Sequence, residues 1–257
     1  MTNFIPSPTL ALLNALALDA GKLIMEIYAT DFSSHAKSDT SPVTAADERA
    51  EAIILQGLAQ HFPNIPVIAE ESVAAGRIPA IAETFFLVDP LDGTKEFISR
   101  NGEFTVNIAL VKNGAPLMGV VFAPALAKLY CGEVNVGAAL SLAGGALQKI
   151  VPRKTPVEGA TVLASRSHRD AATDDFLASV KVANLIAAGS SLKFCTIAEG
   201  KADLYPRFGR TMEWDTAAGH AVLAAAGGKV VGADGTAFNY GKHQRGFDNP
   251  AFIASGS

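Results

Sequence analysis

The stretch from Leu87 to Phe97, which reads Leu-Val-Asp-Pro-Leu-Asp-Gly-Thr-Lys-Glu-Phe, places the strongest constraint on how this chain folds. The apolar residues Phe85 to Val88 predict a buried strand, because an unbroken apolar run suits the interior of a sheet. Pro90 lacks a backbone N–H and is predicted to end that strand at once. The chain is therefore expected to leave a buried strand through a tight turn that carries charged side chains.

Two carboxylates, Asp89 and Asp92, occupy this turn together with the free backbone carbonyl of Leu91. Carboxylate and carbonyl oxygens suit hard divalent cations, Mg²⁺ above all. Gly93 lets the backbone approach a bound group, and the amides that follow it can open a helix whose N-terminus favours phosphate. Metal and phosphate at one turn predict phosphoryl chemistry, with an ordinary Asp-Pro and Asp-Gly loop as the alternative.

Composition and charge narrow the class of protein. The 257 residues are 49% hydrophobic and 18% charged, which is typical of a globular protein with a large core. The net charge is −4 and no Lys/Arg cluster stands out, so nucleic acid is not expected as a partner. Cys131 and Cys195 match no metal spacing and are predicted to be reduced core thiols in a reducing compartment.

The chain offers no signal for export or for a membrane span. The first 18 residues lack the basic start of a signal peptide, and no other uncharged run has the length of a spanning helix. We therefore expect a cytoplasmic protein, with a loose peripheral association at the cytoplasmic face of the inner membrane left open. The choice between a monomer and a homodimer is also open at this stage.

Periodicity predicts a helix pair and then an antiparallel meander in the first half. Ser7-Pro8 predicts a helix start, and Thr44-Ala-Ala-Asp47 predicts a capping box that opens a second helix. Asn113-Gly114 between two β-rich runs predicts a hairpin. Strands in this half are expected at residues 66–69, 85–88, 105–111, 117–122, 128–132, 138–140 and 146–151.

Strands and helices alternate in the second half. Helices are expected at residues 171–180, 190–199 and 214–226, and buried strands at 162–164, 185–187 and 202–205. Residues 229–231 and 252–254 are expected to form a closing pair of strands. This order predicts an α+β fold of stacked layers in two halves, an N-terminal α+β half over residues 1–152 and a C-terminal α/β half over residues 153–257.

Acidic residues recur where predicted elements start or stop: Asp47, Glu70, Asp89, Asp92 and Asp215. Strand ends meet at one edge of a sheet, so these carboxylates can converge there. Crowded carboxylates repel one another, and a bound metal cation relieves the repulsion. Each position also has a plainer interpretation, because Asp47 and Asp215 can simply cap helices and Glu70 can lie on a surface turn.

Three groups of residues resemble the paired signatures of the inositol-monophosphatase-like, lithium-sensitive phosphatases: Glu70-Glu71, Asp89 to Thr94, and Trp214 to Gly219. The resemblance runs nearly end to end. It implies a layered α/β/α/β/α fold of the sugar-phosphatase type, dependence on Mg²⁺ and inhibition by lithium. Further segments are similar to the bacterial 3'(2'),5'-bisphosphate nucleotidases within that superfamily: residues 89–97, 101–109, 165–168, 189–195 and 204–209.

The resemblance implies a metal site of two to three Mg²⁺ ions. Glu70, Asp89 and the Leu91 carbonyl would hold one ion, and Asp89, Asp92 and Asp215 a second. A third ion would bind more weakly near Glu70 through waters. The last metal ligand, Asp215, would thus come from the C-terminal half, while the others come from the N-terminal half.

The resemblance also implies catalytic and substrate-binding residues. Asp47 and Thr94 would form the dyad that takes a proton from the attacking water, and the amides of Gly93 and Thr94 would hold the scissile phosphate. The nucleotide and its second phosphate would be bound by His168, Ser190, Lys193 and Arg207. The other histidines, His35, His61, His220 and His243, show no ligand spacing and are predicted to be structural or solvent-facing.

The implied function is Mg²⁺-dependent removal of the 3'-phosphate from adenosine 3',5'-bisphosphate, which gives AMP and phosphate. The sulfated analogue, 3'-phosphoadenylyl sulfate, is a further candidate substrate, and the resemblance places the reaction in sulfate assimilation and nucleotide recycling. Lys193 and Arg207 offer the cations that a second phosphate needs and an inositol monophosphate does not. The alternatives are an inositol or sugar monophosphatase with the same metal core, and a phosphatase-like protein that acts by binding a partner.

Overall fold

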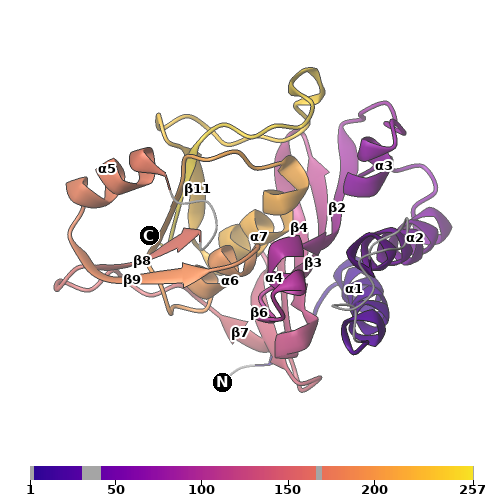
Figure 1. The fold of residues 1–257 in the computed structure, drawn as a ribbon, viewed down its shortest axis with the longest axis horizontal. Coiled ribbons are helices and arrows are strands. Elements are labelled where there is room, and N and C mark those ends of the chain that lie inside the picture. The colour runs from indigo at the N-terminus through magenta and orange to yellow at the C-terminus, as the bar shows by residue number, and fades with distance from the viewer. Residues whose placement is uncertain (1–2, 31–41, 166–169, 257) are drawn as a thin grey trace.

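The computed structural model describes residues 3–30, 42–165 and 170–256, and these fold into two β-sheets with helices before, between and after them (Figure 1). The helices are α1 (Pro8–Tyr28), α2 (Pro42–His61), α3 (Glu70–Ala74), α4 (Thr94–Ile98), α5 (Ala171–Ser179), α6 (Leu192–Ala198) and α7 (Glu213–Ala226). Short 3₁₀ turns lie at Pro124–Leu126 and His243–Arg245. The strands of the first sheet are β1 (Val67–Ala69), β2 (Thr84–Asp92), β3 (Thr105–Lys112), β4 (Ala115–Ala123), β5 (Lys128–Glu133), β6 (Gly137–Leu142) and β7 (Gln148–Ile150). Those of the second are β8 (Ala160–Ser165), β9 (Val182–Ala188), β10 (Leu204–Arg207), β11 (Lys229–Gly232) and β12 (Phe252–Ser255).

The elements stack as five layers. Helices α1 and α2 pack on one face of the seven-stranded sheet, and α6 and α7 pack on the other. The five-stranded sheet lies beyond α6 and α7, and α5 lies outside it (Figure 1). This is the α/β/α/β/α order that the sequence predicts, so the α+β fold class is confirmed. No helix within the described ranges has both the length and the apolar character needed to cross a lipid bilayer.

The N-terminal helix pair differs from expectation at one end. Ser7 caps α1 as predicted, since its Oγ accepts from the Leu10 N–H at 3.3 Å. Helix α2, however, begins at Pro42, so the predicted start at Thr44 is wrong by two residues. Proline is favoured in a first helical turn because its missing N–H would have no helical partner there. As a result Asp47 lies in the second turn of α2 and does not close a capping box.

The seven-stranded sheet follows chain order, with β1 parallel to β2 and every later neighbour antiparallel. The predicted hairpin is confirmed between β3 and β4. Asn113 and Gly114 have φ values of 53° and 74°, both in the left-handed region that a two-residue primed turn requires. The predicted meander through β5, β6 and β7 is also confirmed.

Pro90 does not end β2, which corrects the sequence interpretation. The strand continues to Asp92, but its register with β3 shifts: Asp89 pairs with Asn107 and Asp92 with Thr105. One extra residue is therefore accommodated in β2 between the two carboxylates, as in a β-bulge. A bulge tolerates proline because the inserted residue needs no ladder hydrogen bond. The bulge thus lies between the two carboxylates, Asp89 and Asp92, at the end of β2.

The five-stranded sheet has the order β11-β12-β10-β8-β9. The predicted strand at residues 185–187 is confirmed within β9, but the prediction that it is buried is wrong. Strand β9 lies at the edge of the sheet, and Leu185 and Ile186 are 43% and 44% exposed. The closing pair is confirmed, with β11 and β12 antiparallel. Cys131 and Cys195 are both buried free thiols, as predicted, and burial raises the pKa of each above its usual range.

Helix α7 is held unusually close to the seven-stranded sheet. A Cβ added to Gly119 of β4 would lie 2.3 Å from the Ala218 carbonyl oxygen, and one added to Gly132 would lie 2.9 Å from the Val222 Cα. Glycine at these positions lets the helix backbone rest directly on the strands. The close approach fixes the height of the first turn of α7, which carries Asp215.

We predict that Gly119→Ala lowers the free energy of unfolding by about 1–3 kcal/mol, because the methyl group must push α7 away from β4. The measurement is urea unfolding followed by circular dichroism. Ala115→Ser, at an exposed position of the same strand, is the control and should change the free energy by less than about 0.5 kcal/mol. Equal stability of Gly119→Ala and the parent protein would contradict the close packing of α7.

Candidate active site

A cavity of about 500 Å³ opens where the first sheet, the second sheet and α7 meet. Its walls include most of the residues that the sequence singles out, although these are up to 123 positions apart, from Asp92 to Asp215. The predicted residues that line it are Asp92, Gly93, Thr94, Ser190, Lys193, Arg207 and Asp215. His168 and His35 lie outside the described residues, so their predicted roles stay predictions.

The bulge of β2 fixes the first two carboxylates. Asp89 is 1% exposed, and its Oδ1 accepts from the Leu91 N–H at 3.0 Å across Pro90. Asp92 Oδ2 accepts from the Ser191 N–H at 2.7 Å and from Asn107 Nδ2 at 3.3 Å. These bonds orient each carboxylate through one of its oxygens.

Asp215 occupies the third position of α7. Its Oδ2 accepts from the Met212 N–H at 2.8 Å, which closes the N-terminus of the helix. The plainer interpretation, that Asp215 caps its helix, is therefore correct in part. Asp215 also lines the cavity with Asp92, so capping and a place in the site are combined in one side chain.

Glu70 and Asp47 complete the acidic group from the side of the helix pair. Glu70 is the first residue of α3, directly after β1. Its carboxyl group is close enough to Asp89 for the two to share a hydrogen bond. Glu51 of α2 holds this corner, because its carboxylate accepts from the Glu71 N–H at 2.8 Å and from Ser72 Oγ at 2.6 Å.

Burial makes this acidic group costly to ionise. Burial, with the charges of Glu71 and Glu70, raises the pKa of Asp47 to about 8. Burial, with the charge of Asp92, raises the pKa of Glu70 to about 7. The pKa values of Asp89 and Asp215 lie well above the usual range, first through burial and then through neighbouring carboxylates. A cation would remove this cost, since it supplies the missing positive charge.

The donor set suits a hard divalent cation. It consists of carboxylate and backbone carbonyl oxygens, without sulfur or imidazole among the predicted ligands. Among the residues that the structure describes, no three acidic, histidine or cysteine side chains are already gathered into a closed metal cage. The carboxyl contact between Glu70 and Asp89 requires a proton where a cation would otherwise lie. The chemistry of the group therefore fits a metal, with small side-chain adjustments on binding.

Gly93 and Thr94 form the floor of the cavity. Gly93 has φ 97° and precedes α4, and a Cβ at this position would lie 3.2 Å from the Glu103 carbonyl oxygen. Glycine is needed there for both reasons. Thr94 is exposed to the cavity. No hydrogen bond joins Thr94 to Asp47 in the described structure, so their predicted dyad stays a prediction.

Part of the cavity lining is cationic. Lys193 of α6 is only 4% exposed, and burial lowers the pKa of its ammonium to about 8, opposed by the charge of Asp92. Its Nζ donates to the carbonyl of Ser190 at 2.6 Å. Arg207 ends β10 and donates from Nη2 to the Arg210 carbonyl at 2.9 Å. Lys193 and Arg207 thus form a cationic wall of the cavity, which Asp92 and Asp215 also line.

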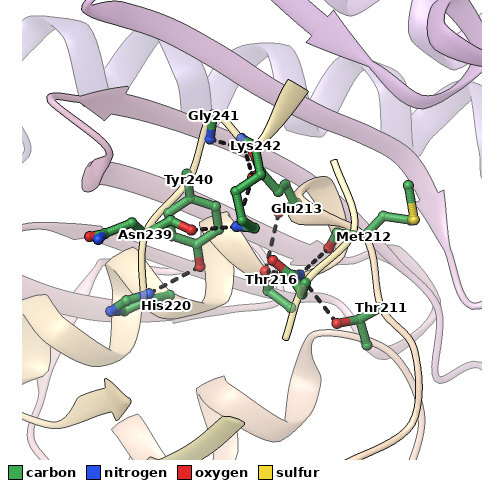
Figure 2. Close-up of polar contacts among 10 residues, drawn as sticks. Thr211, Met212, Glu213, Thr216, His220, Asn239, Tyr240, Gly241 and Lys242 are labelled. Carbon is green, nitrogen blue, oxygen red and sulfur yellow. Dashed lines mark hydrogen bonds and ion pairs between the residues drawn. The ribbon is translucent and has the colours of Figure 1, made fainter. Parts of the chain in front are cut away.

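A buried cluster that the sequence interpretation missed holds the start of α7 (Figure 2). Glu213 is fully buried; its Oε2 accepts from the Gly241 N–H at 2.7 Å, and its Oε1 pairs with Lys242 Nζ at 2.7 Å. Asn249 Nδ2 donates to the Met212 carbonyl at 2.7 Å. These bonds hold the segment before Asp215 against residues 241–249. In the sequence, the position of Glu213 directly before Trp214-Asp215 could have indicated its role at the start of α7.

The described histidines outside the cavity have structural or surface positions, as predicted. His220 is buried in α7, and its Nδ1 lies 3.0 Å from the Tyr240 hydroxyl (Figure 2). Burial lowers the pKa of His220 to about 4, so it is neutral near pH 7. His61 is exposed at the end of α2, and His243 lies in a 3₁₀ turn against Phe247.

Comparisons with known proteins agree on one family. Residues 6–253 match a sequence model of the inositol monophosphatase family. The chain is 46% identical over 244 residues to "3'(2'),5'-bisphosphate nucleotidase CysQ" of Escherichia coli O157:H7, which covers 93% of this chain and 96% of that protein. The solved structure of CysQ from Bacteroides thetaiotaomicron, described as a bacterial member of the inositol monophosphatase family, is similar with a TM-score of 0.82 and 39% identity over 96% of this chain and 97% of that chain. The inositol monophosphatase of Anabaena is similar with a TM-score of 0.77 and 25% identity, over 97% of this chain and 90% of the other.

We predict that the metal-free protein loses stability as the pH rises from 6.5 to 8. The folded state keeps protons on Asp47, Glu70, Asp89 and Asp215 that the unfolded state has already released, because the folded pKa values are raised. Stability must then fall with pH, by about 2 kcal/mol over this window for each proton that the folded state retains throughout it. His220 and Lys193 act in the opposite direction. His220 does so mainly below the window, and Lys193, whose pKa burial lowers to about 8, offsets only part of the fall near pH 8.

Urea unfolding in EDTA at several pH values measures this slope. Addition of Mg²⁺ should raise stability most at pH 8, because the cation replaces the protons that the folded state must otherwise hold. Asp89→Asn should reduce the slope in EDTA, and Asp19→Asn, at an exposed position of α1, should leave it unchanged. A metal-free protein whose stability is flat or rising between pH 6.5 and 8 would contradict the raised pKa values.

Proposed function

Because the chain belongs to the inositol monophosphatase family, we propose that it is a metal-dependent phosphatase that acts on a nucleotide bisphosphate. The reaction is hydrolysis of the 3'-phosphate of adenosine 3',5'-bisphosphate to AMP and phosphate. Its relatives named CysQ are 3'(2'),5'-bisphosphate nucleotidases. The observation that carries the substrate assignment is the cavity itself, which Lys193 and Arg207 line together with Asp92 and Asp215.

Mg²⁺ is the proposed cofactor, with two to three ions per site. Glu70, Asp89 and the Leu91 carbonyl would hold one ion, and Asp89, Asp92 and Asp215 a second. The bound cations acidify water and offset the negative charge of the phosphoryl group. This matters because a phosphate monoester dianion repels the nucleophile, and its uncatalysed hydrolysis is among the slowest reactions that enzymes accelerate.

The chain's own groups position the substrate and move the proton. The Gly93 and Thr94 amides would hold the scissile phosphate, and the Thr94 hydroxyl would orient the attacking water. Asp47 would accept the proton from Thr94. The pKa of Asp47, raised to about 8 by burial, suits a base that works near neutral pH. Direct attack by water needs no covalent enzyme intermediate.

The 5'-phosphate would be bound at the cationic wall. Arg207 can bind a phosphate through two parallel N–H groups, while Lys193 acts as a point charge. Ser190 and, by resemblance, His168 would contact the same part of the nucleotide. The sulfated analogue carries the same 3'-phosphate and is proposed as a second substrate.

The first test compares phosphate release from equal concentrations of adenosine 3',5'-bisphosphate and inositol 1-phosphate, with Mg²⁺ and with EDTA. We expect strong preference for the nucleotide and loss of activity in EDTA. Preference for inositol 1-phosphate would overturn the substrate assignment and leave the metal chemistry. Release from neither compound would instead favour a binding protein.

We predict that Lys193→Ala and Arg207→Ala each lower kcat/KM for the bisphosphate by about 10- to 150-fold, the cost of losing one charge-assisted hydrogen bond of about 1.5–3 kcal/mol. Lys201→Ala is the matched control, since Lys201 is exposed and pairs with Glu199 away from the cavity. Steady-state kinetics with both substrates gives the readout. Equal losses on inositol 1-phosphate would argue against a 5'-phosphate site.

Asp47→Asn should lower kcat by about 10²- to 10⁴-fold, because it removes proton acceptance and no substrate contact. Nucleotide affinity, measured by calorimetry with AMP, should change little. Glu48→Gln, at the exposed neighbouring position of α2, should keep full activity. An Asp47→Asn enzyme with the parent's turnover would remove Asp47 from the mechanism.

A further inference from the structure

One turn, residues 189–191, lies between the acidic group and the cationic wall. It connects the end of β9 to the start of α6. Ser191 is 1% exposed, and its N–H donates to Asp92 Oδ2 at 2.7 Å. Its Oγ donates to the Asp215 carbonyl at 2.5 Å. This one buried serine therefore contacts both Asp92 of β2 and Asp215 of α7, the two residues on either side of the proposed second metal position.

Asn107 of β3 locks this serine in place. Its Nδ2 donates to Ser191 Oγ at 3.1 Å and also to Asp92 Oδ2 at 3.3 Å. The Asn107 Oδ1 is fixed in turn by Thr105 Oγ1 at 3.0 Å. Asn107 and Thr105 are fully buried, so these bonds are shielded from water. The hydroxyl of Ser191 thus has one acceptor and one donor in defined directions.

Lys193 holds the same turn from the other side. Its Nζ donates to the carbonyls of Ser190 and Ala188 at 2.6 and 3.2 Å and lies 5.2 Å from the centre of the Tyr205 ring. Ser190 has φ 44°, an unfavourable conformation for a residue with a side chain. The strained turn needs these contacts to keep its shape. An anion that binds Lys193 must act on the group that supports the turn.

We propose that Ser191 is a positioning residue that couples binding of the nucleotide's 5'-phosphate at Lys193 to binding of a divalent cation between Asp92 and Asp215. This inference rests on the proposed function and adds to it. Both ligands require the same conformation of this strained turn. The ligand that binds first supplies the free energy that orders the turn, so the second ligand binds more tightly. Thermodynamic linkage makes the effect equal in both directions.

The test measures Mg²⁺ affinity by calorimetry with and without 3'-deoxyadenosine 5'-monophosphate. This probe carries the 5'-phosphate but lacks the 3'-oxygen that would reach the metal directly. In the parent protein the saturating probe should tighten Mg²⁺ binding by about 5-fold or more, a typical size for coupling between sites. In Ser191→Ala that factor should fall toward 1, while each ligand alone still binds.

Thr196→Ala is the matched control. Thr196 lies in α6, the helix that follows Ser191, and donates from Oγ1 to the Leu192 carbonyl. This hydrogen bond involves neither Asp92 nor Asp215, the two acidic residues that Ser191 contacts. It should keep the parent's coupling factor. The proposal is overturned if the parent shows no coupling, if Ser191→Ala keeps it, or if Thr196→Ala loses it equally.

A measurement on the parent protein decides the matter if Ser191→Ala does not fold. Mg²⁺ alone and the probe alone should each slow amide hydrogen exchange in residues 189–192, because each stabilises the turn. The proposal is overturned if either ligand leaves the amide exchange rates of residues 189–192 unchanged. Phosphate release from the bisphosphate is recorded in parallel. Activity without coupling defeats this inference alone, whereas absence of activity on the nucleotide defeats the proposed function.

Discussion

Mutual repulsion among buried carboxylates is the constraint on which the rest of this structure depends. Asp89 and Asp92 at the end of β2 and Asp215 at the start of α7 are brought together out of water, where burial first and then neighbouring carboxylates raise the pKa values of Asp89 and Asp215. No fold gathers such groups without cost. The cost is met by the surroundings: backbone N–H groups of Leu91, Ser191 and Met212 each bind one carboxylate. Lys193 and Arg207 offset only part of the negative charge, since the pKa values of Asp92 and Asp215 remain raised, and this favours a cation.

Close packing gives these hydrogen bonds their fixed geometry. Glycines at positions 119 and 132 let α7 rest on the sheet, and Glu213 with Lys242 holds the first turn of that helix from the outside. The buried Glu213 pair adds little net stability on general grounds, since desolvation offsets attraction. The pair instead orients the helix. Glu213 accepts from two successive backbone amides, those of Gly241 and Lys242, and so fixes where α7 begins.

Signals within a few residues of one another predicted most of the fold. Asn113-Gly114 specifies its hairpin, Ser7-Pro8 its cap, and Gly227 the end of α7, because each acts on its own backbone. The wrong predictions concern features that depend on contacts with segments distant in the sequence. Pro90 is accommodated by a bulge against β3, and the apolar residues of β9 lie at a sheet edge that no local pattern reveals. Similarly, the acidic residues were predictable from element ends, whereas Ser191 and Asn107 were not, since they meet across 84 positions of sequence.

The division of the cavity explains how one metal core can serve different substrates. The acidic side provides the features that any phosphate monoester needs for hydrolysis, while the cationic side adds a requirement for a second anion at a fixed distance. In the proposed function, a substrate with two phosphates would place one at the acidic side and the other at Lys193 and Arg207. Because residues 189–191 touch both sides, the turn cannot change for the sake of specificity without moving a neighbour of Asp92 and Asp215. The proposed coupling would therefore link substrate choice to metal binding through this one turn.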